Sequence, residues 1–166
     1  MIRPILIHPD PRLKKTCDPV AQVTEDLAKL ARDMLDTMYD APGIGLAAPQ
    51  IGVTKRLIVM DCMKAPETPR PLILFNPEVV WSSSELSTYE EGCLSIPDQY
   101  ADVTRPQMIR ARWMDEHGVQ HERELDALLS TCLQHEMDHL EGVLFIDHLS
   151  KLKRDILLKK LAKLRR

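Results

Sequence analysis

Residues 126–142 read DALLSTCLQHEMDHLEG, and this stretch decides the fold because it joins an apolar helix to a compact group of polar side chains. Asp126 suits the N-cap position, and Gly142 suits the position just after the last helical turn. The apolar residues between them predict a buried helix at the centre of the molecule. Within it, His135 and His139 are four residues apart, so both imidazoles lie on one face.

The same residues form the pattern H-E-x-x-H, in which two imidazoles can reach one metal ion while Glu136 lies beside it. The alternative is a pair of hydrogen-bonded histidines on a packed helix. That alternative gives no reason for the charged Glu136 and Asp138 in so apolar a helix. The pattern therefore predicts a metal site with a carboxylate next to it.

Two histidines leave a catalytic metal site one protein ligand short. A metzincin has a third histidine further along, but this chain has Phe145 at that position. A thermolysin-like protease uses a downstream glutamate. The only glutamate after the second histidine is Glu141, which is too close along the helix to turn back. The third ligand is therefore expected upstream.

Two upstream cysteines come into consideration as this ligand. Cys132 is seven residues before His139, which is about 10 Å along the helix at 1.5 Å per residue, and one ion cannot bridge that distance. Cys93 is the better candidate, because Gly92 before it permits a close backbone approach. The alternative interpretation of Cys93 is a small buried apolar residue.

Three segments resemble, in order and spacing, the signature motifs of bacterial peptide deformylases. They are residues 43–50 (GIGLAAPQ), residues 91–95 (EGCLS) and residues 134–139 (QHEMDH). The resemblance extends over essentially the whole chain. It implies a metallohydrolase that removes the N-formyl group from the N-terminal methionine of nascent peptides and releases formate. It also implies Fe(II) as the usual metal, although Zn, Ni or Co can occupy the same ligands.

The resemblance also assigns roles to individual residues. The implied metal ligands are Cys93, His135 and His139. Glu136 is the implied acid and base, which takes a proton from the attacking water and passes it to the leaving amine. The oxyanion would be stabilised by Gln50 and by the backbone N–H of Leu94. A site with three protein ligands keeps a position open for that water.

The pocket for the methionine side chain is predicted from helix geometry and from the resemblance. Cys132 and Leu128 lie about one and two turns before His135 on the same face, so they can form an apolar wall beside the metal. Core packing is an equally good explanation for Leu128 and Ile44. The lining residues that the resemblance adds are Ile44, Gly45, Tyr89, Glu91 and Gly92.

The chain departs from many members of the resembled family at Tyr100, where they have arginine. A substrate contact made through that arginine therefore does not carry over to this chain. Residues 43–48 also fit the G-x-G-x-x-G/A fingerprint of dinucleotide-binding folds. They follow a predicted helix instead of a strand, and Pro49 obstructs the helix that should come next. A tight loop lining a cleft fits these residues better.

The remaining pattern predicts how the central helix is covered. Apolar residues at helical spacing from Thr24 predict an N-terminal helix that stops at Pro42-Gly43. A last helix is expected at about 150–165. The expected strands are 56–60, 72–75, 79–81 and a hairpin of 108–114 with 119–125. This order predicts an α+β fold, a single catalytic domain over residues 1–166, with mostly antiparallel β-sheets wrapped around the central metal-binding helix and flanking N-terminal and C-terminal helices.

The composition is that of an ordinary globular protein, with 44% hydrophobic residues, 28% charged residues and a net charge of −3. It does not indicate general nucleic-acid binding. No run of residues approaches the length of a membrane span, and the N-terminus lacks a secretory pattern, so a cytoplasmic location is expected. The four cysteines are too scattered for a disulfide framework. The chain is expected to act as a monomer.

The C-terminal segment differs in charge from the rest. Residues 151–166 contain eight Lys or Arg and one Asp, a local charge of +7, which leaves −10 for the other residues. Because nascent substrates emerge from ribosomes, we expect the helix at about 150–165 to contact ribosomal RNA. A helix packed on its leucines with a solvated basic face is an equally good interpretation.

Two rival functions use the same residues. A metallopeptidase shares the H-E-x-x-H chemistry, but the downstream ligand is missing, and the paired glycine and cysteine motifs argue against it. A non-catalytic zinc module needs four protein ligands, whereas three are evident here. A carboxylate beside the ion would also have no purpose in such a module.

Overall fold

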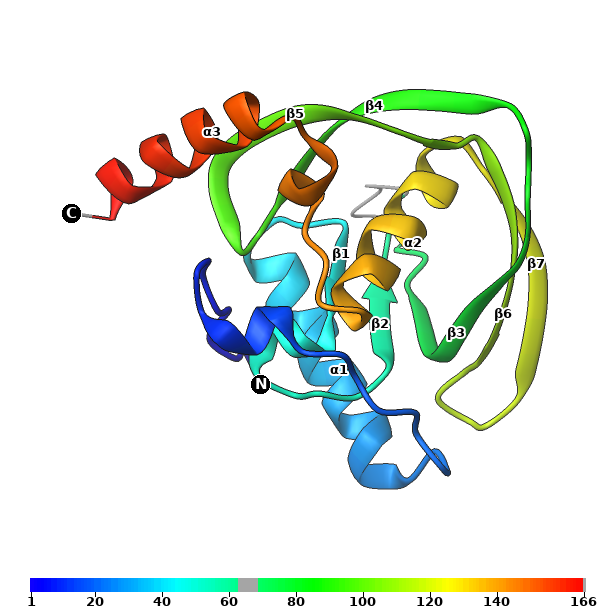
Figure 1. Cartoon of the computed structure of the whole chain (residues 1–166). Coiled ribbons are helices and arrows are strands. Elements are labelled where there is room, and N and C mark those ends of the chain that lie inside the picture. Colours follow the sequence, from blue (N-terminus) through cyan, green and yellow to red (C-terminus); the bar gives the residue numbers. More distant parts are fainter. Residues whose placement is uncertain (63–68, 166) are drawn as a thin grey trace.

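The structure is a computed structural model that describes residues 1–62 and 69–165 (Figure 1). The helices are α1 (Glu25–Asp40), α2 (Ala127–Leu140) and α3 (Lys151–Leu164), with short 3-10 turns at Pro11–Lys14, Ala48–Ile51 and Phe145–His148. The strands are β1 (Gly45–Ala47), β2 (Leu57–Met60), β3 (Leu72–Ser82), β4 (Leu86–Cys93), β5 (Ile96–Pro106), β6 (Met108–Met114) and β7 (Gln120–Asp126).

Two antiparallel sheets surround α2. The larger has the strand order β1-β2-β3-β6-β7, and the smaller pairs β4 with β5. In Figure 1, the long curved strands pass around α2, while α1 and α3 lie outside them. This arrangement confirms the predicted α+β class with mostly antiparallel sheets around a central helix. Among the described residues, no helix is long and apolar enough to cross a membrane.

Local signals at both ends of α2 explain its bounds. The Asp126 carboxylate accepts a hydrogen bond from the N–H of Ala127 at 2.7 Å. At the other end, Gly142 has a φ of 73°, which favours glycine. A Cβ there would lie 2.4 Å from the Lys14 carbonyl oxygen, so a side chain has no room. The predicted start and stop of the helix are confirmed.

Strand β2 separates two parts of the core. The side chains of Ile58 and Met60 belong to the cluster that includes Leu133 of α2. Those of Leu57 and Val59 belong to the cluster around α1, whose buried members on that helix are Leu30, Ala31, Met34 and Met38. Because alternate residues of a strand point to opposite faces, a strand buried on both sides serves both clusters. This packing fixes α1 and α2 on opposite sides of the larger sheet.

The strands were predicted less completely than the helices. The two expected runs at 72–75 and 79–81 form one strand, β3, which continues through register shifts at Phe75/Glu78 and Val79/Trp81. Asn76 has a φ of 50° there, so the irregular backbone hid the continuity. The predicted hairpin is confirmed as β6 and β7. Strands β4 and β5 were not predicted, because neither has a continuous apolar run and because they contain Gly92 and Pro97.

Candidate metal centre

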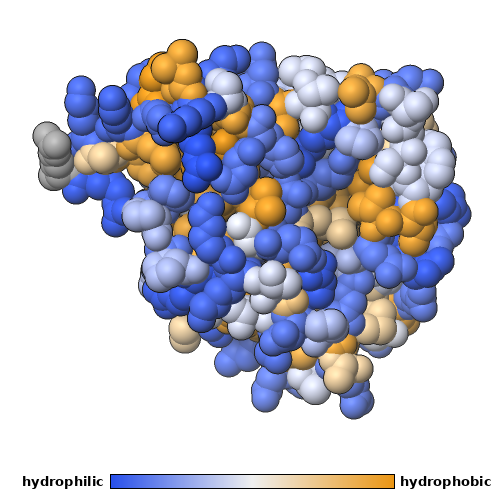
Figure 2. Space-filling model, in the orientation of Figure 1, coloured by the Kyte–Doolittle hydropathy of each residue, from blue (hydrophilic) through white to orange (hydrophobic). Residues whose placement is uncertain are grey.

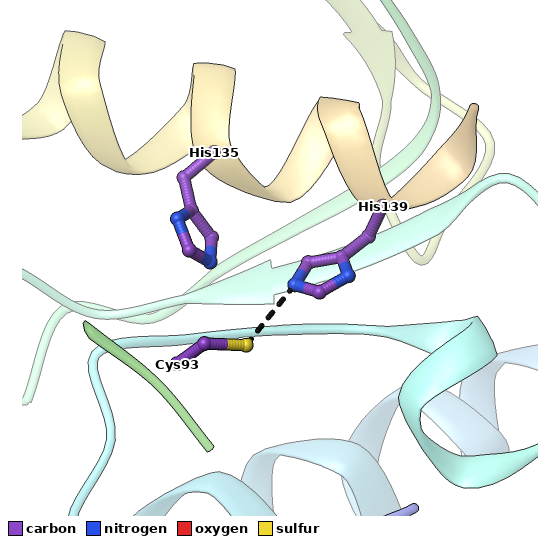
Figure 3. A group of neighbouring side chains, drawn as sticks. All are labelled: Cys93, His135 and His139. Carbon is purple, nitrogen blue, oxygen red and sulfur yellow. Dashed lines mark hydrogen bonds between the residues drawn. The ribbon is translucent and has the colours of Figure 1, made fainter. Parts of the chain in front are cut away.

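Three side chains from two distant segments converge beside α2. Cys93 ends β4, while His135 and His139 lie one turn apart on α2. One potential ligand atom from each residue lies within 4.8 Å of those from the other two. Figure 3 shows both imidazoles directed from the helix toward the sulfur, with Cys93 Sγ 3.4 Å from His139 Nε2. The structure therefore brings together the three residues that were predicted to bind a metal.

The orientation of His135 is set by a carboxylate behind it. Its Nδ1 lies 2.9 Å from Oε1 of Glu91, which leaves Nε2 as the free ring nitrogen. Two guanidinium nitrogens of Arg105 donate to the same carboxylate at 2.8 and 3.0 Å. Burial alone would raise the pKa of Glu91, but the hydrogen bonds to His135 and Arg105 outweigh it and lower that pKa. Glu91 is therefore an anion that can fix the imidazole.

Arg105 extends this network to the surface. It is buried in β5, and its third guanidinium nitrogen donates to Asp138 at 2.9 Å. Nε2 of His148 lies 2.8 Å from the same carboxylate oxygen. Neither Arg105 nor this use of Glu91 was predicted from the sequence. One feature of the sequence could have pointed to this network. The adjacent carboxylates Glu90 and Glu91 precede Gly92, and an ordinary exposed strand does not require such an acidic pair.

Glu136 occupies a buried position next to the ligands. The residue is 5% exposed, and its Oε1 has no hydrogen-bond partner within the described residues. Burial is the main cause that raises the pKa of this carboxyl group to about 7. On β1, a Cβ added at Gly45 would lie 2.6 Å from Glu136 Oε2. The absence of a side chain at Gly45 therefore makes room for the carboxylate.

Gln50 is held with its amide nitrogen toward the centre. Its Oε1 accepts from the N–H of Ala47 at 2.9 Å, and its Nε2 donates to Ser95 Oγ at 3.1 Å. The same nitrogen lies 3.5 Å from Cys93 Sγ. The side chain of Leu94 packs against Gly43, where a Cβ would be 2.8 Å from Leu94 Cδ1. The predicted oxyanion residues thus flank the predicted metal ligands.

A cavity of about 490 Å³ opens beside this centre. The predicted site residues that line it are Ile44, Gly45, Gln50, Gly92, Cys93, Leu94, His135 and Glu136. Four of the residues predicted to contact the substrate are not in its wall, as far as the described residues define it: Tyr89, Glu91, Leu128 and Cys132.

These four residues have other surroundings, and Tyr89 lies opposite Val103 in the β4–β5 ladder. Glu91 holds His135 from behind, and Leu128 is 37% exposed near the start of α2. Cys132 lies behind the wall, where a Cβ at Gly45 would be 3.0 Å from its sulfur. A hydrogen bond with the Cys62 thiol is the main cause that raises the pKa of Cys132, and burial adds to it. Its buried neutral thiol is suited to packing behind Gly45, in place of the predicted role as a pocket wall.

The arrangement fits a metal ion of the kind that imidazole and thiolate ligands bind. One sulfur and two imidazoles form a donor set for Zn or Fe, with room for a fourth, non-protein ligand. Burial, followed by the neighbouring His135, holds the pKa of His139 well below its ordinary value, so its ring is neutral. A neutral imidazole is the form that binds metal. Among the described residues three potential ligands converge, which is the number typical of a catalytic site, whereas a closed structural site has four.

Known proteins are similar to this chain over nearly its whole length. A family model described as polypeptide deformylase matches residues 2–155. The peptide deformylase of Rhizobium meliloti is 56% identical over 162 residues, which cover 98% of this chain and 93% of that protein. A crystal structure of a peptide deformylase from Legionella pneumophila has a TM-score of 0.94 at 46% identity and covers 100% of this chain and 96% of that chain.

A further solved structure carries a bound molecule. It is a peptide deformylase from Ehrlichia chaffeensis in complex with actinonin, similar to this chain at 37% identity with a TM-score of 0.92. The similarity covers 99% of this chain and 98% of that one.

Proposed function

The chain belongs to the polypeptide deformylase family, and from that premise we propose that the residues around its buried centre perform the family's reaction with one divalent metal ion. The enzyme is a hydrolase that removes the N-formyl group from the N-terminal methionine of newly synthesised proteins and releases formate. The catalytic domain proposed for this reaction extends over residues 1–166.

Cys93, His135 and His139 would hold the ion. The closeness of their ligand atoms and the Glu91–His135 hydrogen bond support this assignment. When bound, the ion supplies Lewis-acid activation of water and of the formyl carbonyl. We propose Fe(II) as the native metal, and Zn, Ni or Co can use the same donor set. Metal analysis of protein purified without oxygen tests this choice.

Glu136 is proposed to move the proton. Its carboxylate lines the cavity and has an oxygen without a partner in the described part of the chain, so it can accept a proton from the attacking water. The same group can then pass that proton to the amine that leaves. Its burial supports the role, because a carboxyl group with a pKa near 7 exchanges protons readily at neutral pH.

Gln50 and Leu94 are proposed to stabilise the oxyanion. The N–H of Ala47 fixes the carbonyl end of the Gln50 side chain, which turns the amide N–H₂ toward the reacting group. The backbone N–H of Leu94 follows the metal ligand Cys93 directly in the chain. We assign Ile44, Gly45 and Gly92 to substrate contact because they line the cavity, and Cys132 to packing behind Gly45.

The observation that carries this proposal is the buried carboxylate of Glu136 beside the converging sulfur and imidazoles. Its test is formate release from a formyl-Met-Ala-Ser peptide by wild type and by Glu136→Gln. We expect the variant to lose two or more orders of magnitude in kcat, in the range of about 10²–10⁴ for general acid–base catalysis, while it keeps its metal. Loss of the metal together with activity would contradict the assignment of Glu136.

Two further substrates separate the rival functions. An acetyl-Met peptide and an unblocked protein should both remain intact, because the proposed enzyme acts on the formyl group. Cleavage of the unblocked protein would indicate a metallopeptidase. A wild-type protein that binds metal but acts on none of the three substrates would indicate a non-catalytic metal module.

We also propose that the enzyme works as a monomer in the cytoplasm and contacts ribosomes through α3. The inner leucines of α3 pack on β5 near Ile96 and Val103. Its outer lysines are exposed, and Figure 2 shows hydrophilic residues beside hydrophobic ones over this helix. The exposed lysines are Lys151, Lys153, Lys159, Lys160 and Lys163.

Charge-neutralising variants test the ribosome contact without exposing the core that Leu161 covers. Replacing the five lysines of α3 by glutamine should weaken co-sedimentation with ribosomes and flatten its dependence on salt. The matched control replaces the exposed Lys15, Lys29 and Lys55 elsewhere on the surface and should leave binding unchanged. Equal binding by both variants would refute the contact.

A further inference from the structure

Two cysteines outside the proposed metal centre meet between β2 and α2. The side chains of Ile58 and Met60 on β2 pack in the core cluster that includes α2. Cys62 is two residues further on and packs against the same cluster. Because alternate residues of an extended chain share a face, Cys62 continues the row on the side of α2. Cys132 enters the cluster from α2, and both cysteines are free thiols.

Contacts around the carbonyl of Ile44 bring these two thiols together. That carbonyl oxygen accepts from the N–H of Asp61, which directly precedes Cys62, at 2.9 Å. The Cys132 thiol donates to the same carbonyl at 3.8 Å. The thiols of Cys62 and Cys132 also interact with each other by a hydrogen bond. The fold therefore places the two sulfurs side by side, although they are far apart in the sequence.

The two thiols differ in their access to solvent. Cys132 is 4% exposed, whereas Cys62 is only partly buried. A small oxidant in solution therefore reaches Cys62 first, since oxidation of cysteine depends on exposure. Cys132 is then the adjacent thiol that can react with the oxidised sulfur. This is the arrangement of an oxidisable cysteine beside a second, resolving cysteine.

We propose that Cys62 and Cys132 form a reversible disulfide when the protein is exposed to hydrogen peroxide, and that this bond slows deformylation. The Cys62 sulfur attacks one peroxide oxygen, the O–O bond breaks, and the products are a sulfenic acid and water. The Cys132 sulfur then attacks the Cys62 sulfur, and the S–O bond breaks with release of a second water. One peroxide is thus reduced to two waters while the two thiols are oxidised to one disulfide.

The expected loss of rate rests on the function proposed above and follows from the position of Cys132. Its sulfur packs behind Gly45, 3.0 Å from where a Cβ of that glycine would be, and Glu136 Oε2 is 2.6 Å from the same point. A disulfide brings its two sulfurs to about 2.0 Å, closer than a hydrogen-bonded pair, so the Cys132 sulfur must leave this place.

The move changes the packing that holds the Glu136 carboxylate one turn further along α2. Small displacements of a catalytic group lower the rate strongly, and we expect a fall of about tenfold in kcat.

The experiment uses protein loaded with Zn(II), which has no redox chemistry of its own, so that peroxide cannot act through the metal. After treatment with hydrogen peroxide, mass spectrometry of a digest should find the peptides of Cys62 and Cys132 joined by a disulfide. Formate release from formyl-Met-Ala-Ser should fall by the expected factor. Dithiothreitol should reverse both changes, whereas oxidation of the proposed ligand Cys93 to a sulfinic acid would be irreversible.

Three variants assign the bond to this pair. Cys62→Ser should have wild-type activity before treatment and should form no crosslink and show no reversible loss of kcat afterwards. Cys132→Ser keeps the exposed thiol and should stop at the sulfenic acid of Cys62, which dimedone labels. The matched control is Cys17→Ala, which removes another buried thiol of the same core cluster and should still form the crosslink.

The outcomes that overturn the proposal are defined by the crosslink and by the rate. A wild-type protein that forms no disulfide between Cys62 and Cys132 refutes it, and so does a disulfide that leaves kcat unchanged. An equal reversible loss of kcat in Cys62→Ser would also refute it. Absence of formate release before any peroxide is added would instead refute the proposed function, so the two failures are distinct.

Discussion

At the scale of single residues, Gly45 shows how one missing side chain shapes the site. A Cβ at this position would lie 2.6 Å from Glu136 Oε2 and 3.0 Å from Cys132 Sγ. Both neighbours are buried on α2 and have little freedom to move away. Glycine at this position is therefore required by the proposed catalytic carboxylate and not by its own backbone conformation.

The Gly45→Ala variant tests this requirement. We expect kcat to fall by about two orders of magnitude, because the added methyl group displaces the Glu136 carboxylate from its place beside the reacting water. The metal should remain bound, since the three atoms nearest to the new methyl group belong to Glu136 and Cys132 and not to the proposed ligands. Formate release and metal content measure the two effects. Normal turnover would show that Glu136 has another position available.

Arg105 neutralises Glu91, the buried carboxylate that orients the proposed metal ligand His135. Its side chain is 6% exposed and that of Glu91 is 5% exposed, so removing the guanidinium leaves a buried carboxylate without its cation. We expect Arg105→Gln to lower the free energy of unfolding by about 3–5 kcal/mol. Urea unfolding of the wild type and the variant measures this difference.

Arg105→Lys separates charge from geometry in this network. Lysine keeps the positive charge but cannot make the paired bonds of a guanidinium to one carboxylate. We therefore expect stability between those of wild type and Arg105→Gln, with metal affinity lowered by about 10–100-fold because Glu91 no longer fixes His135 firmly. Unchanged metal affinity in both variants would show that Glu91 orients His135 without help.

At the scale of elements, the turn between β6 and β7 depends on Asp115. Its carboxylate accepts from the N–H groups of His117 at 2.8 Å and Val119 at 3.0 Å, and it lies 2.7 Å from His121 Nε2. Burial alone would raise the pKa of Asp115. The hydrogen bonds with His121, Val119 and His117 outweigh burial and hold that pKa below its ordinary value of 3.8.

A lowered carboxyl pKa makes this contribution to stability depend on pH. The ionised Asp115 stabilises the fold above its ordinary pKa of 3.8, and the contribution is lost as the pH falls through the lower pKa of the folded state. Asp115→Asn should therefore cost about 1 kcal/mol at neutral pH. Urea unfolding over a pH series should show wild type and variant converging in acid. A difference that stays constant down to low pH would exclude ionisation as its cause.

The elements differ in how well the sequence predicts them. Helix α2 was predicted with its caps, because Asp126, Gly142 and the apolar run between them are local signals. Strands β4 and β5 lack a continuous apolar side, so their pairing depends on contacts between distant residues. The role of Arg105 depends on this pairing and was missed with it. Similarly, spacing on α2 placed Leu128 on the side of His135 but could not show that it stays exposed.

At the scale of the whole molecule, the proposed metal ion would join the smaller sheet to the central helix. Cys93 comes from β4, whereas His135 and His139 come from α2. An ion that binds only the folded state stabilises it, by about 2.7 kcal/mol when the free metal is at 100 times its Kd. We therefore expect a chelator to lower the Tm of the wild type.

The Cys93→Ala variant is the control for metal removal. Without the sulfur ligand, the chelator should change Tm much less than it does in the wild type. Calorimetry with and without chelator measures both proteins under the same conditions. Equal shifts in the two proteins would place the stabilising ion elsewhere.

Strand β2 has a consequence for hydrogen exchange. All four of its residues are buried, and their side chains alternate between the two core clusters. Its ladder bonds to β1 and β3 cannot open without separating α1 from α2. The backbone amides of Ile58, Val59 and Met60 should therefore be among the last to take up deuterium, at the rate at which the entire chain unfolds.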